Sequence, residues 1–432
     1  MSLANKILVA LILGIITGLV MNLSGLSSSA WVDTNIINGL FHVVGKLFVN
    51  ALKMLVVPLV LFSLIPGIVN IGDIRLLGKI GTKSLALYIG TTAIAITTAI
   101  TFAVISGIGK QMTIQIDADF EGRQANKNFS DIFIDIIPNN IVNAMAQSDM
   151  LAIIFFALFF GTALLMVVKE APDLLNVIEQ LNKVVMQMVE IVMWFAPYAV
   201  FCLIAKAIAE LGFDLLQQLA GYFLVVFVTL IFHALVTQMV ILKAVTGLSI
   251  KLFLQKIRNA QVFAFSTASS GATIPITLRT LQERFGIDRA VSSFSVPFGA
   301  NINMDGTSIM QGVATVFIAN LYGIELGITG YVTVVITAVL ASIGTAAVPS
   351  VGLVMLTLVF NQVGLPVEAI GIIIGVDRLL DMTRTAVNVT GDALVTTIVA
   401  KSEGKMNVDV FNDPNSGEVE EIDSLSDLKQ ID

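Results

Sequence analysis

The chain has 432 residues, of which 56% are hydrophobic and 13% are charged, and its formal net charge at pH 7 is −7. Soluble domains carry about 25% charged residues. This composition and a mean hydropathy of +0.90 therefore exclude a soluble protein and indicate an all-α integral membrane protein. One cysteine, Cys202, excludes an intrachain disulfide. His42 and His233 lie far apart in apolar surroundings, without the neighbours of a zinc site, so we expect them to pack in the core.

Apolar runs long enough to cross a bilayer follow one another through the first 245 residues. They predict helices at about 7–23, 40–70, 80–107, 138–168, 177–212 and 219–245. The polar stretch 110–138 predicts an aqueous loop. Lys and Arg gather in the connections on one side, which predicts a cytoplasmic amino terminus and a cytoplasmic carboxyl terminus. The acidic segment 403–432 is expected to be a solvated tail.

The pattern changes after about Leu252, where apolar runs become short and are broken by Gly, Ser, Thr and Pro. Non-helical backbone at membrane depth is tolerated only where it is buried in protein or lines a cavity. We therefore expect re-entrant hairpins at 252–281 and 326–362, each centred on a proline. A polar helix follows each hairpin, at 289–322 and 368–402. This repeated order predicts a solute site near the bilayer midplane.

The segment 377–392 carries an unusual load of charge for a helix that lies between two apolar runs. A charged side chain at the bilayer centre costs roughly 2.5–3.5 kcal/mol on insertion scales. The polar side chains recur with helical spacing, which places them on one face. They are Asp377, Asp381, Arg384, Thr385, Asn388 and Asp392. This face predicts a site for a small charged solute, for an inorganic cation, or for both.

Arg384 and Asp381 indicate the kind of solute that this face could hold. An arginine fork binds a carboxylate through two parallel hydrogen bonds, and a carboxylate one turn away can hold an ammonium group. The two residues together fit a zwitterion that carries an additional carboxylate. The alternative is an internal Arg384–Asp381 ion pair that serves structure alone.

The segment 301–307 reads N-I-N-M-D-G-T, in which Asn and Asp weaken a helix and Gly interrupts it. An unwound turn there would expose backbone carbonyls beside the side-chain oxygens of Asn303 and Asp305. Selectivity for a monovalent cation depends on the number and arrangement of such oxygens, and Asn388 and Asp392 could supply more. The alternative is a glycine kink with an aspartate that caps the following helix.

The tips of the two expected hairpins are rich in small residues. Backbone N–H groups and the positive ends of short helices at such tips suit a carboxylate. The candidates are Ser269 and Ser270 in the first hairpin and residues 347–352 in the second. The alternative is that the small residues only permit close helix packing.

Five segments resemble the dicarboxylate/amino acid:cation symporter family, which includes archaeal aspartate and animal glutamate transporters. They are G-K-L-F at 45–48, K-M-L-V-V-P-L-V at 53–60, N-M-D-G-T at 303–307, S-I-G-T-A-A-V-P at 342–349 and D-M-T-R-T-A-V-N-V-T-G-D at 381–392. The resemblance covers nearly the whole chain, except the acidic tail.

The resemblance implies a homotrimeric, multi-pass carrier of the plasma or inner membrane, with no enzymatic activity and no nucleic-acid partner. It would have about eight transmembrane helices plus two re-entrant hairpins, arranged as inverted repeats. A transport domain would carry substrate along a rigid scaffold like an elevator, importing aspartate or glutamate together with sodium ions. The implied division is scaffold helices at 1–70, a transport-domain helix and an extracellular loop at 71–137, scaffold helices plus a transport-domain helix at 138–245, the transport core at 246–402 and the acidic tail at 403–432.

The resemblance also implies a substrate site and three sodium sites. Arg384 would bind the substrate side-chain carboxylate, and Asp381 would bind its amino group. Further substrate contacts would come from Ser269, Ser270, Thr307, Ala347, Val348, Pro349, Gly352, Thr385 and Asn388. The first sodium site would use Gly299, Asn303, Asn388 and Asp392, the second Tyr88, Thr91, Thr92, Asn303 and Asp305, and the third Asn301, Ser342, Ile343 and Thr345. The second hairpin would close over the substrate as a gate.

Three positions depart from the family pattern. The first hairpin tip reads Ser-Ser-Gly at 269–271, Ala268 stands where some members carry an arginine, and Asn301 stands where a threonine is common. Arg378 could take over the electrostatic role of the missing arginine.

Two rival functions stay open. One is a proton-coupled or C4-dicarboxylate carrier of the same family, although Asp381 favours a substrate with an amine. The other, from a different class, is an intramembrane aspartyl protease with Asp305 and Asp392 as its dyad. The serine-rich hairpins would have no role in such a protease.

Overall fold

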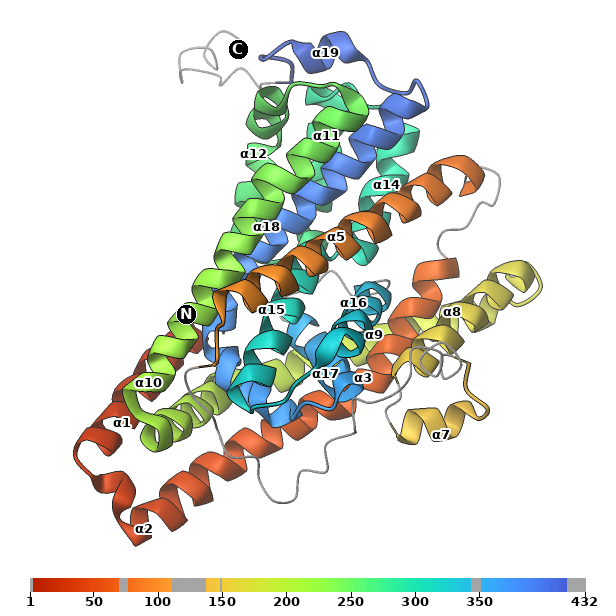
Figure 1. Cartoon of the computed structure of the whole chain (residues 1–432). Helices are drawn as coiled ribbons and strands as arrows, with labels where there is room; N and C mark the ends of the chain where they lie inside the picture. The colour runs from red at the N-terminus through yellow and green to blue at the C-terminus, as the bar shows by residue number, and fades with distance from the viewer. Residues whose placement is uncertain (1–2, 70–76, 111–136, 148–149, 343–350, 418–432) are drawn as a thin grey trace, which may run out of the picture.

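The computed structural model describes residues 3–69, 77–110, 137–147, 150–342 and 351–417 (Figure 1). Within these residues the secondary structure is helical, apart from one isolated β-bridge between Ile287 and Met406. This confirms the predicted all-α class. Three helical stretches, Ala30–Phe62, Lys79–Ser106 and Ala196–Thr246, are long and apolar enough to cross a membrane.

The helices follow the predicted order along the chain, but two predicted spans are each divided between two helices: 138–168 after Ala146 and 177–212 at Phe195. The first half contains α1 (Leu3–Leu23), α2 (Ala30–Val32), α3 (His42–Val69), α5 (Thr82–Ser106), α7 (Ile141–Ala146), α8 (Met150–Val167), α9 (Pro172–Trp194) and α10 (Ala196–Phe232). The second half contains α11 (Gln238–Thr246), α12 (Ile250–Thr267), α13 (Ser270–Arg279), α14 (Arg289–Ile302), α15 (Asp305–Leu321), α16 (Gly327–Ser342), α17 (Val351–Val363), α18 (Ile370–Ser402) and α19 (Val408–Asn412). Short 3₁₀ or π-helical segments join several of them: η1 (Leu26–Ser28), η2 (Asp33–Phe41), η3 (Leu77–Gly81), η4 (His233–Thr237), η5 (Thr280–Arg284) and η6 (Val367–Ala369).

Gly212 divides α10 into two arms. Its φ of 68° and ψ of −152° lie outside the helical region, and glycine adopts positive φ without a steric penalty. A Cβ at this position would lie 3.1 Å from Oδ1 of Asn22. The bend agrees with the predicted boundary between the spans 177–212 and 219–245.

The first predicted hairpin is formed by α12 and α13, which pack against each other. The chain reverses at Ala268, whose φ of 51° is the only positive value at a non-glycine residue among the described residues. Ser269 then caps α13, because its hydroxyl accepts a hydrogen bond from the backbone N of Ala272 at 3.2 Å. The expectation that this hairpin centres on its proline was wrong, since Pro275 lies inside α13.

The predicted unwound turn is confirmed. Helix α14 ends at Ile302 and α15 begins at Asp305, and the backbone of Asn303 between them is extended. The second predicted hairpin is formed by α16 and α17, which also pack against each other, while residues 343–350 lie outside the described residues. The last predicted helix is continuous as α18.

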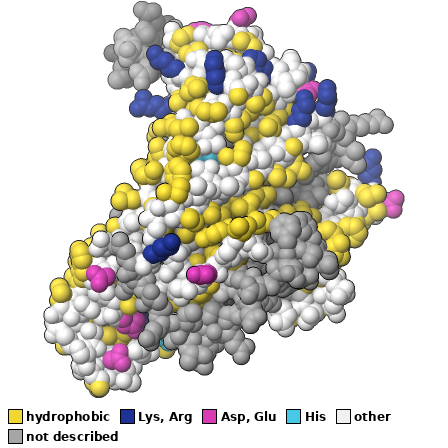
Figure 2. All heavy atoms as spheres, in the orientation of Figure 1, with side chains coloured by type: hydrophobic (Ala, Val, Ile, Leu, Met, Phe, Trp, Pro, Cys, Tyr) yellow, Lys and Arg dark blue, Asp and Glu magenta, His cyan; other side chains and the backbone are white. Residues whose placement is uncertain are grey.

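Helix α18 joins two hydrophobic cores. The residues of its first half, such as Ile373, pack in a core shared with α3, α8, α10 and α17, and those of its second half, such as Leu394, pack in a core shared with α12 and α14. In Figure 1, α18 runs beside α11 and the second arm of α10 along the length of the molecule. Figure 2 shows hydrophobic side chains over the middle of the visible face, while most of its Lys and Arg side chains gather at the end that carries α11, α12 and α19.

The residues after α18 fold back onto the base of the first hairpin. Phe411 on α19 is fully buried and packs edge-on against Phe285. Lys256 of α12 is also buried, and its ammonium group donates to the carbonyl oxygens of Arg284 and Val410 and to the Ser416 hydroxyl. The segment is therefore ordered as far as Ser416, although most of its residues are exposed, as expected for a solvated tail.

Candidate functional site

Charged side chains of α18 form a buried cluster. Arg384 Nη1 lies 2.5 Å from Asp377 Oδ1, and Arg384 Nη2 lies 2.7 Å from Asp381 Oδ1. Arg378 Nη1 lies 3.4 Å from Asp381 Oδ2. Two guanidinium groups thus balance two carboxylates, which offsets much of the cost of burying each charge.

The internal Arg384–Asp381 pair, which was one of two alternatives from the sequence, is therefore present. Asp377 and Arg378, whose roles the sequence left open, complete the cluster. The guanidinium keeps a further donor, because Arg384 Nε has no hydrogen-bond partner among the described residues.

Two glycines bring neighbouring helices against Arg384. A Cβ on Gly352 of α17 would lie 3.1 Å from Thr307 Cγ2 and 3.3 Å from Arg384 Nη2. A Cβ on Gly306 of α15 would lie 2.7 Å from the carbonyl oxygen of Arg384. Three residues predicted to contact substrate, Thr307, Gly352 and Arg384, therefore meet at one point.

Asn388 ties the unwound turn to α18. Its side-chain oxygen accepts a hydrogen bond from the backbone N of Gly306 at 2.7 Å. Its carbonyl oxygen accepts one from Asn303 Nδ2 at 2.9 Å. Asn388 Nδ2 lies 3.4 Å from Met304 Sδ. One residue of the charged helix thus holds both sides of the turn.

Asp305 lies at the centre of a second buried cluster. Thr92 Oγ1 donates to its Oδ1 at 2.8 Å, and Thr91 Oγ1 lies 3.3 Å from the same oxygen. On the other side, His233 Nε2 lies 3.0 Å and Gln238 Nε2 lies 3.4 Å from Oδ2. All five side chains are almost fully buried.

The sequence analysis did not connect His233 or Gln238 to this cluster. His233 does pack in the core, but it also contacts Asp305. The sequence did contain one indication: His233 and Gln238 are polar residues within the apolar span 219–245. A pattern of 3.6 residues per turn places residues 233 and 238 about 140° apart, on different helix faces, so that signal was not sufficient.

Asp392 forms the third group of contacts. Asn303 Nδ2 donates to its Oδ1 at 2.9 Å. A Cβ on Gly299 would lie 2.6 Å from the same oxygen and 2.5 Å from Tyr88 Oη, so only glycine permits this approach. The four residues predicted for the first sodium site are thus brought together: Gly299, Asn303, Asn388 and Asp392. Of those predicted for the second site, Thr91 and Thr92 contact Asp305 directly, and the Tyr88 carbonyl accepts from Thr91 Oγ1 at 3.1 Å. Asn303 contacts Asp392 instead.

Two buried amide oxygens in these clusters have no hydrogen-bond partner among the described residues: Asn303 Oδ1 and Gln238 Oε1. A buried acceptor without a partner costs about 1–3 kcal/mol. Hard cations are held by oxygen ligands of this kind, from carboxylates, amides and carbonyls. The described residues contain no group of three or more His, Cys, Asp or Glu that could hold a metal ion.

The side chains of several other predicted site residues bond to backbone groups near them in the chain. Asn301 is exposed, and its Nδ2 donates to the carbonyl oxygen of Pro297. The hydroxyl of Ser342 donates to the carbonyl oxygen of Val339, and that of Thr385 donates to the carbonyl oxygen of Asp381. Ser269 caps its helix, and Ser270 is buried beside it. Ile343, Thr345, Ala347, Val348 and Pro349 lie outside the described residues, so the third sodium site stays a prediction.

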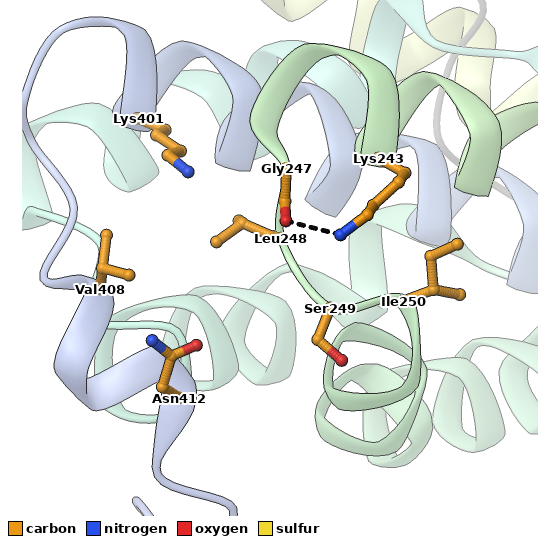
Figure 3. A pocket seen from close by; sticks show the side chains of 8 residues that line it. All are labelled: Lys243, Gly247, Leu248, Ser249, Ile250, Lys401, Val408 and Asn412. Atoms are coloured by element: carbon orange, nitrogen blue, oxygen red, sulfur yellow. Dashed lines mark hydrogen bonds between the residues drawn. The ribbon is translucent and has the colours of Figure 1, made fainter.

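A pocket of about 500 Å³ lies away from these clusters, where α11, α12 and α19 meet (Figure 3). Lys243 and Lys401 line it. Lys243 Nζ donates to the carbonyl oxygen of Gly247 at 2.9 Å, and Lys401 Nζ donates to that of Thr246. Both lysines thus bind the free carbonyl groups at the end of α11.

Buried ionisable side chains within an apolar helical body are typical of membrane transport proteins, where they line substrate and ion pathways. The comparisons with known proteins agree. The family model of the sodium:dicarboxylate symporter family matches residues 3–402, and the chain belongs to this family. It is a multi-pass membrane protein and a transporter rather than an enzyme.

Named relatives extend from bacteria to animals. The chain is 35% identical over 417 residues to the proton/glutamate-aspartate symporter of Escherichia coli, covering 94% of each protein. It is 33% identical to the proton/sodium-glutamate symport protein of Geobacillus stearothermophilus, covering 94% of this chain and 95% of the relative. It is 34% identical to an excitatory amino acid transporter of Caenorhabditis elegans, covering 82% of this chain and 80% of the relative.

Proposed function

We propose that this chain imports aspartate or glutamate together with sodium ions, as a secondary active symporter. The observation that carries the proposal is the position of Asn388. Its side chain binds the backbone of Gly306, and its carbonyl binds Asn303, which in turn binds Asp392. A cation that binds Asn303 Oδ1 would therefore also reposition Asn388, which lies on the proposed substrate-binding helix α18.

The charged cluster supports an acidic amino acid as the substrate. Arg384 would exchange its bond to Asp377 for the side-chain carboxylate of the substrate, and the remaining Asp381 would then be free for the amino group. The substrate carries two carboxylates and one ammonium group, so its binding adds a net charge of −1 to the balanced cluster. A co-transported cation would offset this charge. A charge-assisted, bidentate contact also favours a carboxylate over a neutral side chain.

The polar clusters around Asp305 and Asp392 support cation coupling. Two carboxylates, two free amide oxygens and nearby backbone carbonyls make an oxygen-rich, buried environment. Each net positive charge that enters with the substrate gains about 2.3 kcal/mol per 100 mV of membrane potential, or roughly a fifty-fold concentration ratio.

The remaining features follow the family resemblance as proposals. The protein would be a homotrimer in the cell membrane with both termini in the cytoplasm. The helices of 1–70 and the scaffold part of 138–245 would stay fixed, while the core 246–402 moves as an elevator with the second hairpin as its gate.

The test is uptake of radiolabelled aspartate and glutamate into proteoliposomes with imposed sodium, proton and potassium gradients. We expect uptake that needs an inward sodium gradient and that saturates at a lower concentration for acidic amino acids than for succinate. Equal uptake on a proton gradient without sodium would contradict sodium coupling. This outcome would favour the proton-coupled alternative, since the Escherichia coli relative is a proton/glutamate-aspartate symporter.

A further inference from the structure

Gln238 is a buried amide that joins three helices. It begins α11 and is fully buried. Its Nε2 lies 3.4 Å from Asp305 Oδ2 on α15 and 3.4 Å from the carbonyl oxygen of Val387 on α18. None of the family motifs described above includes this residue.

The two contacts fix the orientation of the amide. Both neighbouring atoms, a carboxylate oxygen and a carbonyl oxygen, can only accept hydrogen bonds. The NH₂ end of Gln238 must therefore face them, and the oxygen end must face the opposite side. There Oε1 is buried and has no hydrogen-bond partner among the described residues.

Asn303 has the same arrangement. Its Nδ2 faces two acceptors, the Asn388 carbonyl oxygen and Asp392 Oδ1, and its Oδ1 is likewise buried without a described partner. The two amides flank Gly391. A Cβ on Gly391 would lie 2.5 Å from Asn303 Nδ2 and 3.0 Å from Gln238 Nε2.

The π-helical turn η4 brings Gln238 to this place. It occupies His233–Thr237, directly before Gln238. A π-turn closes on the fifth residue, and such turns are frequent at functional sites. It therefore moves residues 233 and 238 toward one face, so that both Nε2 atoms reach Asp305 Oδ2.

We propose that Gln238 Oε1 is a ligand of a co-transported monovalent cation, placed beside the Asp305 and Asn303 clusters by the π-turn η4. This inference rests on the proposed function, because it adds a ligand to the cation binding proposed there. The competing occupant of the space next to Oε1 is a buried water molecule, which would also satisfy an acceptor.

The test uses the purified full-length protein and measures thermal stability against sodium or lithium concentration, with choline keeping the ionic strength constant. We expect Gln238→Met to raise the sodium concentration for half-maximal stabilisation about tenfold. Loss of one oxygen should penalise sodium more than the smaller lithium ion, because selectivity follows the number of ligands. The ratio of lithium affinity to sodium affinity should therefore rise.

Two further variants distinguish two possible roles of Gln238: a cation ligand through Oε1, or a hydrogen-bond donor that only positions Asp305. Gln238→Glu keeps an oxygen but loses the NH₂ group, so we expect sodium affinity within about threefold of the parent protein. Gln261→Met is the matched control, because Gln261 is an amide that bonds only Thr390 Oγ1 at 2.8 Å in the described contacts, away from Asp305. It should leave both ion affinities unchanged.

Several outcomes would overturn the inference. They are an unchanged sodium requirement in Gln238→Met, an equal loss for sodium and lithium, and a Gln238→Glu protein that binds sodium more weakly than Gln238→Met. A parent protein that neither sodium nor lithium stabilises would instead overturn the proposed cation coupling. The two failures are thus distinguishable.

Discussion

Asp377 and Arg384 are seven residues apart on one helix, and their side chains meet in a buried ion pair with an O–N distance of 2.5 Å. The guanidinium also holds Asp381. A substrate carboxylate would be a third anion that can pair with the Arg384 guanidinium. If Arg384 binds the substrate carboxylate, as proposed, Asp377 would occupy the position of that carboxylate in the substrate-free protein.

Asp377→Asn should lower the melting temperature of the substrate-free protein more than that of the aspartate-saturated protein. Removal of one partner from a buried ion pair costs about 3–5 kcal/mol, and a bound substrate would replace the lost charge. Thermal unfolding with and without aspartate measures the difference. Glu368→Gln is the control, since its pair with Lys46 is partly exposed and should contribute no more than about 1 kcal/mol. Equal destabilisation of both states would contradict this role of Asp377.

Arg384→Cys should shift the substrate preference toward neutral amino acids. The variant loses the charge-assisted contacts to the substrate carboxylate, which are worth about 1.5–3 kcal/mol, so aspartate affinity should fall at least tenfold. Competition of aspartate and serine for uptake into proteoliposomes measures the shift. An unchanged aspartate affinity would show that another group binds the side-chain carboxylate.

Gly391→Ala should weaken ion-dependent stabilisation at least tenfold. The added methyl group would lie 2.5 Å from Asn303 Nδ2 and must displace this buried amide. Gly90→Ala is the matched control, because a Cβ at Gly90 meets nothing within 4 Å and alanine favours the helix by up to about 1 kcal/mol. The ion dependence of thermal stability compares the two. A normal sodium requirement in Gly391→Ala would argue against a cation beside Asn303.

Lys256→Met should detach α19 from the base of the first hairpin. The substitution leaves two carbonyl oxygens and the Ser416 hydroxyl without the donated hydrogen bonds. Limited proteolysis should then cut residues 403–417 at least tenfold faster, while the rest of the chain stays resistant. Lys251→Met is the control, because Lys251 is exposed on the same helix. Equal cleavage rates in both variants would mean that the other contacts of the segment, such as those of Phe411 and of Asn407 with the Gly286 carbonyl oxygen, hold it without Lys256.

A cross-link between Lys46→Cys and Glu368→Cys should stop uptake, and reductive cleavage should restore it. The two residues form an ion pair at 3.1 Å that joins α3 to the segment before α18. If the core moves along the scaffold, this contact must open in each cycle. A Cys202→Ala background removes the single native cysteine. A short bis-methanethiosulfonate makes the link, because each end forms a disulfide with one cysteine and releases methanesulfinate, and a reductant cleaves both disulfides. Full activity of the cross-linked protein would contradict the movement.

The sequence by itself determined the helical class, the order of the elements and the family. Long apolar runs, the broken segment 301–307 and the charged face 377–392 are local patterns, and a membrane makes such patterns unusually informative. The unwound turn at Asn303 and the continuous helix that carries Arg384 were predicted correctly for this reason. The proline expected at the first reversal was misleading, because the local backbone at Ala268 and Ser269 determines where the chain turns.

Only the tertiary structure decided which polar groups meet. The pairing of Asp377 with Arg384 depends on the side-chain directions of one helix in a crowded interior. The convergence of His233 and Gln238 on Asp305 depends on a π-turn, which the 3.6-residue period does not reveal. Contacts such as that of Asn388 with Gly306 depend on the relative register of two helices. Register is set by packing across the whole core, and no local pattern of residues specifies it.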